Sequence, residues 1–129
     1  DGAARGNPGP AAVGVVITDS TGKTVREFGR CIGHATNNVA EYHALLHALD
    51  QAQALGIESI LVRSDSELLV KQMNGLYRVK HEQLLPLFLE AREKCRNFDA
   101  VEFIHLPRSQ NRRADQLANM ALDTPDPEA

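Results

Sequence analysis

The sequence predicts an α/β protein in which a mixed β-sheet carries helices on its faces. Residues 11–19 and 23–33 are rich in β-forming side chains and flank an Asp-Ser-Thr-Gly turn, which predicts a hairpin. Residues 58–65 are a short run with Ile60, Leu61 and Val62 in succession, which is typical of a strand in a buried parallel position, and residues 100–107 predict another strand. Segments with helical spacing of apolar residues alternate with these runs, and this alternation favours a sheet that is parallel in part.

Turn and cap residues set the boundaries of the first half of the chain. Residues 1–10 hold three glycines and two prolines, so we expect a turn whose backbone can approach a ligand closely. Asn37 and Asn38 offer N-cap chemistry for a long helix. That helix is expected to run to Leu55 and to end at Gly56.

Three further helices are expected in the second half. Ser66 can cap a short helix over residues 66–73. Residues 81–98 form a second long amphipathic pattern, with Pro86 near its first turn. The last helix is expected over residues 111–122.

Length and composition indicate one domain. The chain has 129 residues, of which 43% are hydrophobic, and this is enough for a real core. We expect the domain to span residues 1–123, and residues 124–129, which are rich in proline and acid, to be a tail or a linker. A monomer is the default expectation, and the domain can form part of a longer, multidomain chain.

Charge, hydropathy and cysteine content exclude several classes. The net charge of −3 excludes a general basic coat, so any nucleic acid must bind to a local patch. No apolar run approaches the roughly 18 residues of a membrane span, and no signal peptide is apparent, so no membrane partner is expected. Cys31 and Cys95 match no zinc or CxxC spacing, and free thiols indicate a reducing cytoplasm.

Glu41 is an acid in an unfavourable position. At 100° per residue it points into the apolar side of its helix, where a lone carboxylate is costly. A positive partner at that place would explain it. The apolar arc consists of Ala44, Leu45, Ala48, Leu49, Ala52 and Leu55.

Asp1, Asp65 and Asp115 can join Glu41 in one site. Asp65 ends a strand of the parallel type, where the ligand sites of open α/β sheets gather. Carboxylate oxygens are the ligands that Mg²⁺ prefers. Two ions about 4 Å apart can clamp the attacking and leaving oxygens of a phosphodiester. The four acids therefore predict a metal pair.

Four segments, DGAARGNPGP, TNNVAEYHAL, VRSDSELLV and NRRADQLAN, together resemble the signature segments of type 1 ribonuclease H, in its archaeal-like short form. The resemblance spans Asp1 to about Leu122. It implies a five-stranded mixed sheet in the order 3-2-1-4-5 with helices on both faces. It also implies endonucleolytic, Mg²⁺- or Mn²⁺-dependent cleavage of the RNA strand of RNA–DNA hybrids by two metal ions, leaving 5′-phosphate and 3′-hydroxyl ends.

The resemblance also implies residue roles. Asp1 would bridge both ions, Glu41 and Asp65 would hold the ion nearer the leaving group, and Asp115 the ion that activates water. An amide or carboxylate in the minor groove can recognise the 2′-hydroxyl of RNA, and backbone near glycine can approach a sugar or phosphate. The substrate-binding residues implied in this way are Gly2, Asn7, Asn37, Asn38, Ser66 and Glu67.

Two segments depart from the family pattern. Many bacterial members carry a loop histidine before the last acid, whereas Arg108 occupies that region here. Arginine cannot act as a base at neutral pH, so we expect Arg108 to steer or release phosphate. Residues 74–82 are too few to hold the basic protrusion of other members, so we expect fewer phosphate contacts and weaker hybrid binding.

Each of these residues also has a purely structural interpretation. Glu41 could direct its head group to solvent near the helix start, Asp65 could cap the next helix, and Asp115 could favour a helix dipole. Asn37 and Asn38 could be caps only. At the level of function, the alternatives are a non-catalytic nucleic-acid-binding module of the same fold and a junction resolvase.

Overall fold

The structure is a computed structural model and describes residues 1–124. The predicted tail is therefore outside the described residues except for Thr124. The elements, in chain order, are β1 (Gly2–Ala4), β2 (Gly9–Thr18), β3 (Thr24–Ala35), α1 (Asn37–Ala54), β4 (Ser59–Ser64), α2 (Glu67–Met73), α3 (Leu84–Cys95), β5 (Ala100–His105), the 3₁₀ turn η1 (Arg108–Gln110) and α4 (Arg112–Asp123).

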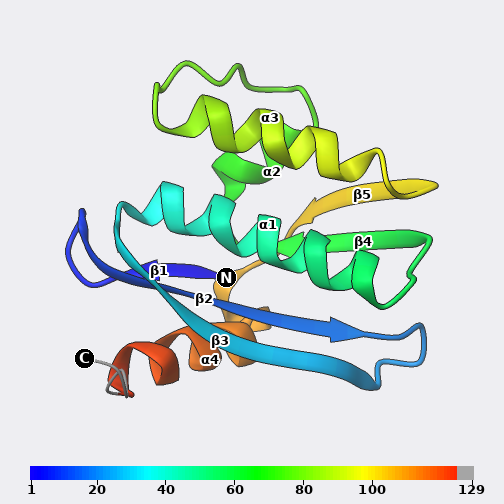
Figure 1. Cartoon of the computed structure of the whole chain (residues 1–129), viewed down its shortest axis with the longest axis horizontal. Coiled ribbons are helices and arrows are strands. Elements are labelled where there is room, and N and C mark those ends of the chain that lie inside the picture. Colours follow the sequence, from blue (N-terminus) through cyan, green and yellow to red (C-terminus); the bar gives the residue numbers. More distant parts are fainter. Residues whose placement is uncertain (125–129) are drawn as a thin grey trace.

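The helices cover both faces of the strands, as predicted (Figure 1). Helix α1 lies on one face against β1 and β2, and α3 packs on the outer side of α1. Helix α4 lies on the opposite face against β2 and β3. The α/β fold class is confirmed.

The expected continuous five-stranded sheet differs at one junction. The strands form two hydrogen-bonded sets, β1-β2-β3 and β4-β5, and within the described residues β1 does not pair with β4. The reason is where β1 lies relative to β4. The carboxylate of Asp1, just before β1, lies close to that of Asp65, which comes just after β4, so none of the described residues runs beside β4 on that side.

The β2–β3 hairpin has the predicted turn. Asp19 Oδ1 accepts bonds from the backbone N–H groups of Thr21 (2.9 Å) and Lys23 (3.0 Å), and Gly22 adopts a positive φ of 87°. The ladder continues without a break except at two register shifts, and β4 and β5 are parallel, as their apolar composition indicated. β2 is thus held by β3 along its length, and β4 is held by β5.

Two glycines allow α4 to lie directly on the hairpin. A Cβ atom at Gly14 would lie 1.8 Å from the carbonyl oxygen of Ala114, and one at Gly29 would lie 2.1 Å from that of Leu117. No side chain fits at either position. This close approach fixes the depth of α4, and therefore the height at which Asp115 stands above the strands.

The main core lies between α1, α3 and the face of β4 and β5. Its largest fully buried side chain, Tyr42, donates a 2.6 Å hydrogen bond from Oη to Oε1 of the buried Gln72. The bond joins α1 to α2 and satisfies both polar groups.

Replacing Tyr42 with phenylalanine should therefore lower the free energy of unfolding by about 1–3 kcal/mol, because a buried acceptor on Gln72 loses its donor. Chemical denaturation of the variant measures the change. Tyr77→Phe is the matched control, since Tyr77 is exposed, and it should change stability by less than about 0.5 kcal/mol. Equal effects for the two variants would contradict the importance of the buried bond.

The cap of α1 differs from the prediction. Asn37 and Asn38 are the first helical residues, and Thr36 is the N-cap, with its hydroxyl accepting from the N–H of Val39 at 3.2 Å. The side chain of Asn37 instead accepts a hydrogen bond from the backbone N–H of Ala4 in β1. The hydroxyl of the preceding residue, Thr36, caps the helix.

Candidate metal centre

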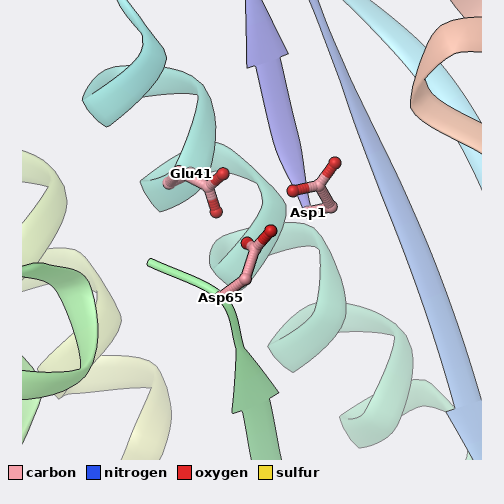
Figure 2. A group of neighbouring side chains, drawn as sticks. All are labelled: Asp1, Glu41 and Asp65. Atoms are coloured by element: carbon pink, nitrogen blue, oxygen red, sulfur yellow. The ribbon is translucent and has the colours of Figure 1, made fainter. Parts of the chain in front are cut away.

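Three of the four predicted acids meet at one point (Figure 2). Asp1 precedes β1, Glu41 lies in the first half of α1, and Asp65 follows β4. One carboxylate oxygen from each residue lies within 4.8 Å of the others. Three elements that are distant in sequence therefore present three carboxylates to a common space, and such oxygens are the ligands that a hard divalent cation takes.

Local geometry explains why Asp1 and Glu41 come so close. Gly2 is buried, and a Cβ atom there would lie 2.1 Å from the carbonyl carbon of Ala40. The lack of a side chain lets the backbone of α1 approach β1. The amino group and the carbonyl oxygen of Asp1 each form a 2.7 Å bond with Gly14 of β2. These bonds hold the main chain of Asp1 at the edge of the hairpin.

Asp65 is positioned by the turn from β4 into α2. The hydroxyl of Ser64, which is buried, accepts a bond from the N–H of Ser66 at 3.1 Å. Ser66 in turn caps α2 by accepting from the N–H of Leu69 at 3.2 Å, as the sequence predicted. Asp65 therefore need not serve as the cap, and its carboxylate is available to the cluster.

The electrostatics of the cluster favour a cation. Burial raises the pKa of the Glu41 carboxyl to about 7, Asp65 adds to the rise, and the positive amino group of Asp1 opposes it. Burial lowers the pKa of that amino group, against the attraction of the surrounding carboxylates. Asp1 Oδ2 is buried and has no hydrogen-bond partner. An unsatisfied carboxylate oxygen among further carboxylates is chemically suited to a divalent metal ion.

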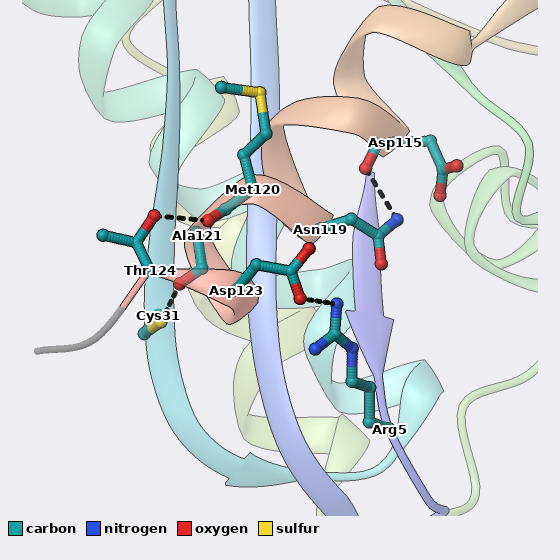
Figure 3. Close-up of polar contacts among 8 residues, drawn as sticks. All are labelled: Arg5, Cys31, Asp115, Asn119, Met120, Ala121, Asp123 and Thr124. Atoms are coloured by element: carbon teal, nitrogen blue, oxygen red, sulfur yellow. Dashed lines mark hydrogen bonds and ion pairs between the residues drawn. The ribbon is translucent and has the colours of Figure 1, made fainter.

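Asp115 stands beside this group without joining it. It lies in the first turn of α4, and its Oδ1 is 3.4 Å from a guanidinium nitrogen of Arg108. Its charge still acts on Glu41 and on the Asp1 amino group. Figure 3 shows further contacts of α4. The side chain of Asn119 donates a hydrogen bond to the backbone oxygen of Asp115 at 2.9 Å, and at the far end of the helix Arg5 forms a 2.7 Å ion pair with Asp123.

The predicted substrate residues belong to two parts of the chain: the segment from β1 to the start of α1, and the start of α2. In the first part, Asn7 Oδ1 accepts from the N–H of Asn37 at 3.0 Å, and Asn37 Oδ1 accepts from the N–H of Ala4 at 3.1 Å. These bonds tie the glycine-rich loop to the start of α1, beside the exposed Asn38. In the second part, Glu67 in the first turn of α2 forms a 2.6 Å ion pair with Lys71.

Two features of the site were not expected from the sequence. Arg113 binds both carboxylate oxygens of Glu27 in β3, at 2.6 and 3.1 Å, and so anchors the start of α4. Asn111 Nδ2, just before α4, is buried and has no hydrogen-bond partner. The pair Arg112-Arg113 indicated that a basic group precedes Asp115, but no pattern in the sequence indicates that its acidic partner is Glu27 of β3.

The raised pKa of Glu41 predicts how the stability of the cation-free protein changes with pH. This carboxyl titrates near 4.5 when unfolded and near 7 when folded, so the folded state binds more protons between those values. The free energy of unfolding should therefore fall as pH rises from about 4.5 to about 7. Denaturant titrations across that range, with chelator present, measure the fall.

Glu41→Gln provides the control, because it removes the titrating group. Its stability should change less over the same pH range than that of the unchanged protein. A divalent cation should oppose the fall, since it binds the ionised form. If the unchanged protein and Glu41→Gln gave parallel pH curves in chelator, burial of the Glu41 carboxyl would not be the cause.

The fold and the three acids define an α/β protein with a cluster of carboxylates that could hold a metal ion. The family described as reverse transcriptase-like matches residues 1–121. Ribonuclease HI of Halobacterium salinarum is 49% identical over 123 residues, which are 95% of this chain and 62% of that protein. The crystal structure of RNase H1 from Halobacterium salinarum superposes with a TM-score of 0.94, covering 95% of this chain and 93% of the other. The chain therefore belongs to the type 1 ribonuclease H family.

Two further relatives give context. LC11-RNase H1, whose structure was solved in complex with an RNA/DNA hybrid, is 47% identical, has a TM-score of 0.92 and is matched over 93% of its chain, 95% of this one. The bifunctional protein Rv2228c of Mycobacterium tuberculosis is 45% identical over 95% of this chain. This chain spans 62% of the Halobacterium protein and 34% of the mycobacterial one.

Proposed function

We propose that this protein is a metal-dependent endoribonuclease that hydrolyses the RNA strand of RNA–DNA hybrids and leaves 5′-phosphate and 3′-hydroxyl ends. The observation that carries the proposal is the meeting of Asp1, Glu41 and Asp65 within 4.8 Å. A relative of 47% identity that binds an RNA/DNA hybrid supports the choice of substrate.

The residues present fit Mg²⁺, with Mn²⁺ as the alternative, in a two-ion site. Asp1, Glu41 and Asp65 would hold the first ion, and Asp115, released from Arg108, would complete the site for the second. When bound, such ions neutralise the scissile phosphate and lower the pKa of water. Bound ions would also stabilise the site itself, because four acids in one place repel each other and the positive charge relieves that repulsion.

We assign substrate selection to the glycine-rich segment around Asn7 and to the first turns of α1 and α2. Asn7, Asn37, Asn38 and Glu67 carry amide or carboxylate groups that can bond a 2′-hydroxyl, which distinguishes RNA from DNA. Gly2 and Ser66 bring backbone and hydroxyl groups next to Asp1 and Asp65. Arg108 is exposed and can pair with a phosphate when Asp115 takes a cation.

The test is cleavage of an end-labelled RNA–DNA hybrid, with duplex DNA, duplex RNA and single strands as controls. Each substrate is incubated with Mg²⁺, with Mn²⁺ and with EDTA. Metal-dependent loss of the hybrid's RNA strand alone is expected. Hybrid binding without cleavage in either metal would overturn the catalytic function and leave a non-catalytic binding module.

We also propose a monomer that works in the cytoplasm. The two cysteines, Cys31 and Cys95, are free, in keeping with a reducing compartment. No helix among the described residues is long and apolar enough to cross a membrane.

A further inference from the structure

Strand β3 carries two arginines that have no acidic partner. It is the outer strand of the β1-β2-β3 set, and residues 26–30 lie between its two register shifts, so their side chains alternate between the faces of the sheet. Glu27 faces α4, where it binds Arg113. Arg26 and Arg30 therefore lie on the other face, which is the one that α1 covers (Figure 1). Both are exposed, and no ion pair within the described part of the chain includes either of them.

Each guanidinium group is held in place by a neighbour. Arg26 donates a 2.5 Å hydrogen bond to Oε1 of Gln51 in α1. The guanidinium carbon of Arg30 lies 5.5 Å from the centroid of the Phe28 ring, which is a cation–π contact. The Phe28 ring in turn meets the ring of His47 edge to face, with 6.3 Å between their centroids. Four residues of a strand span about 13 Å, so two fixed positive charges stand in line along β3 at roughly that spacing.

Helix α1 adds to this surface two imidazole rings and a carboxylate that is already paired. His43 and His47 are partly buried and lie one helical turn apart. Burial lowers the pKa of His47, Arg30 and His43 lower it further, and Asp50 opposes them. The carboxylate of Asp50 is itself paired with Lys94 at 2.7 Å. We call this set of side chains the basic strip; it consists of Arg26, Phe28, Arg30, His43, His47 and Gln51.

The basic strip is separate from the carboxylate cluster. His47 follows Glu41 by six residues, which at about 100° per residue turns its side chain about 240° around α1. The two side chains therefore point to different sides of the helix. The roles proposed above use no residue of the strip, and a ligand on the strip does not need the acids of the cluster.

We propose that the basic strip is a second binding site, which takes the phosphate backbone of one nucleic-acid strand. A guanidinium group without a carboxylate partner can bind a phosphate through two parallel hydrogen bonds. A row of phosphates offers repeated charges to two guanidinium groups held in line, and the ring surfaces between them suit the sugars and bases. The chain has a net charge of −3, so a local patch of this kind is where a polyanion meets least repulsion. The inference goes beyond the proposed cleavage, because it involves neither the acids nor a metal ion.

Binding of fluorescently labelled single strands to the whole protein tests the proposal. The probes are an oligothymidylate and an oligouridylate of about 12 nucleotides, measured by fluorescence anisotropy in EDTA so that neither is cut. Arg26→Gln/Arg30→Gln should weaken the binding of both probes at least about tenfold. It should also reduce the dependence of log K on log salt by about 1.4, because each phosphate contact to a single strand contributes roughly 0.7.

The matched control is Arg92→Gln/Arg96→Gln, which removes the same charge from α3. Arg92 also stacks on an aromatic ring, with 5.7 Å to the centroid of Phe88, but Arg96 beside it is paired with Glu93 at 3.2 Å. This variant should bind both probes within about twofold of the unchanged protein. Equal losses in the two variants, or no binding of either probe by the unchanged protein at low salt, would overturn the proposal.

Two other roles for the strip predict different results. Charged side chains on an outer strand also prevent two sheets from pairing edge to edge. In that case Arg26→Gln/Arg30→Gln would self-associate in sedimentation velocity and keep its affinity for the probes, which would contradict the proposal. If the ligand were an acidic protein segment, a polyglutamate peptide of equal charge would displace the probes as well as unlabelled oligonucleotide does, and the assignment to nucleic acid would fail. We expect monomeric variants and only weak competition by the peptide.

Discussion

Asp65→Asn should reduce cleavage of the RNA–DNA hybrid to below about one tenth of normal and leave the fold intact. The substitution removes one negative charge from a cluster whose oxygens lie within 4.8 Å, with almost no change in volume. The loss of charge weakens cation binding, and the lost oxygen cannot be replaced by an amide nitrogen. Steady-state cleavage in Mg²⁺ and circular dichroism of the same samples measure the two effects.

The matched control is Asp99→Asn. Asp99 is exposed and precedes β5, so it lies at the opposite end of the parallel pair from Asp65. It should leave cleavage unchanged. If Asp65→Asn kept more than a tenth of the normal rate, the assignment of the metal site would be wrong.

Gly14→Ala should have the largest effect on stability. The new Cβ atom would lie 1.8 Å from the carbonyl oxygen of Ala114 and 2.8 Å from its carbonyl carbon, and both are backbone atoms that cannot rotate away. Helix α4 must move off the sheet. We expect the free energy of unfolding to fall by about 3 kcal/mol or more. Because α4 carries Asp115, cleavage by the protein that remains folded should fall as well.

Gly33→Ala separates this steric effect from the loss of glycine flexibility. No atom lies within 4 Å of the added Cβ at Gly33, but its φ of 83° is unfavourable for alanine. The expected loss is only about 1–2 kcal/mol. Denaturant unfolding of both variants gives the comparison. If the two variants lost equal amounts of stability, close packing of α4 would not be the reason that position 14 requires glycine.

Local chemistry made several parts of the fold predictable. The turn at Asp19 and Gly22, the cap at Ser66 and the end of α1 at Gly56 each depend on residues within a few positions. The Asn37 prediction was wrong at this same level. Thr36 and Asn37 can both cap a helix, and the choice depended on Ala4 and Asn7, which bond Asn37 from more than 25 residues away.

The site was predictable for a different reason. Glu41 stood out because it is a charged residue on the apolar side of a helix. The resemblance of four segments to those of the family then predicted that the other three acids lie near it. The structure brings Asp1, Glu41 and Asp65 together. The metal roles of all four acids, and the substrate roles of the asparagines and Glu67, stay predictions. Sequence could not reveal that Asp115 pairs with Arg108, because the pair depends on how η1 and α4 pack.

By itself, the sequence determined the α/β class, the order of the helices and of the strands from β2 onward, the family and the identity of the acidic residues. These features depend on periodicity, turn chemistry and motif spacing, which are properties of short segments. The strand β1 lies where the sequence predicted only a turn. Only the tertiary structure decided how closely α1 and α4 approach the strands at Gly2 and Gly14, and which acids meet. Those features depend on backbone packing between distant segments, and no local pattern encodes that distance.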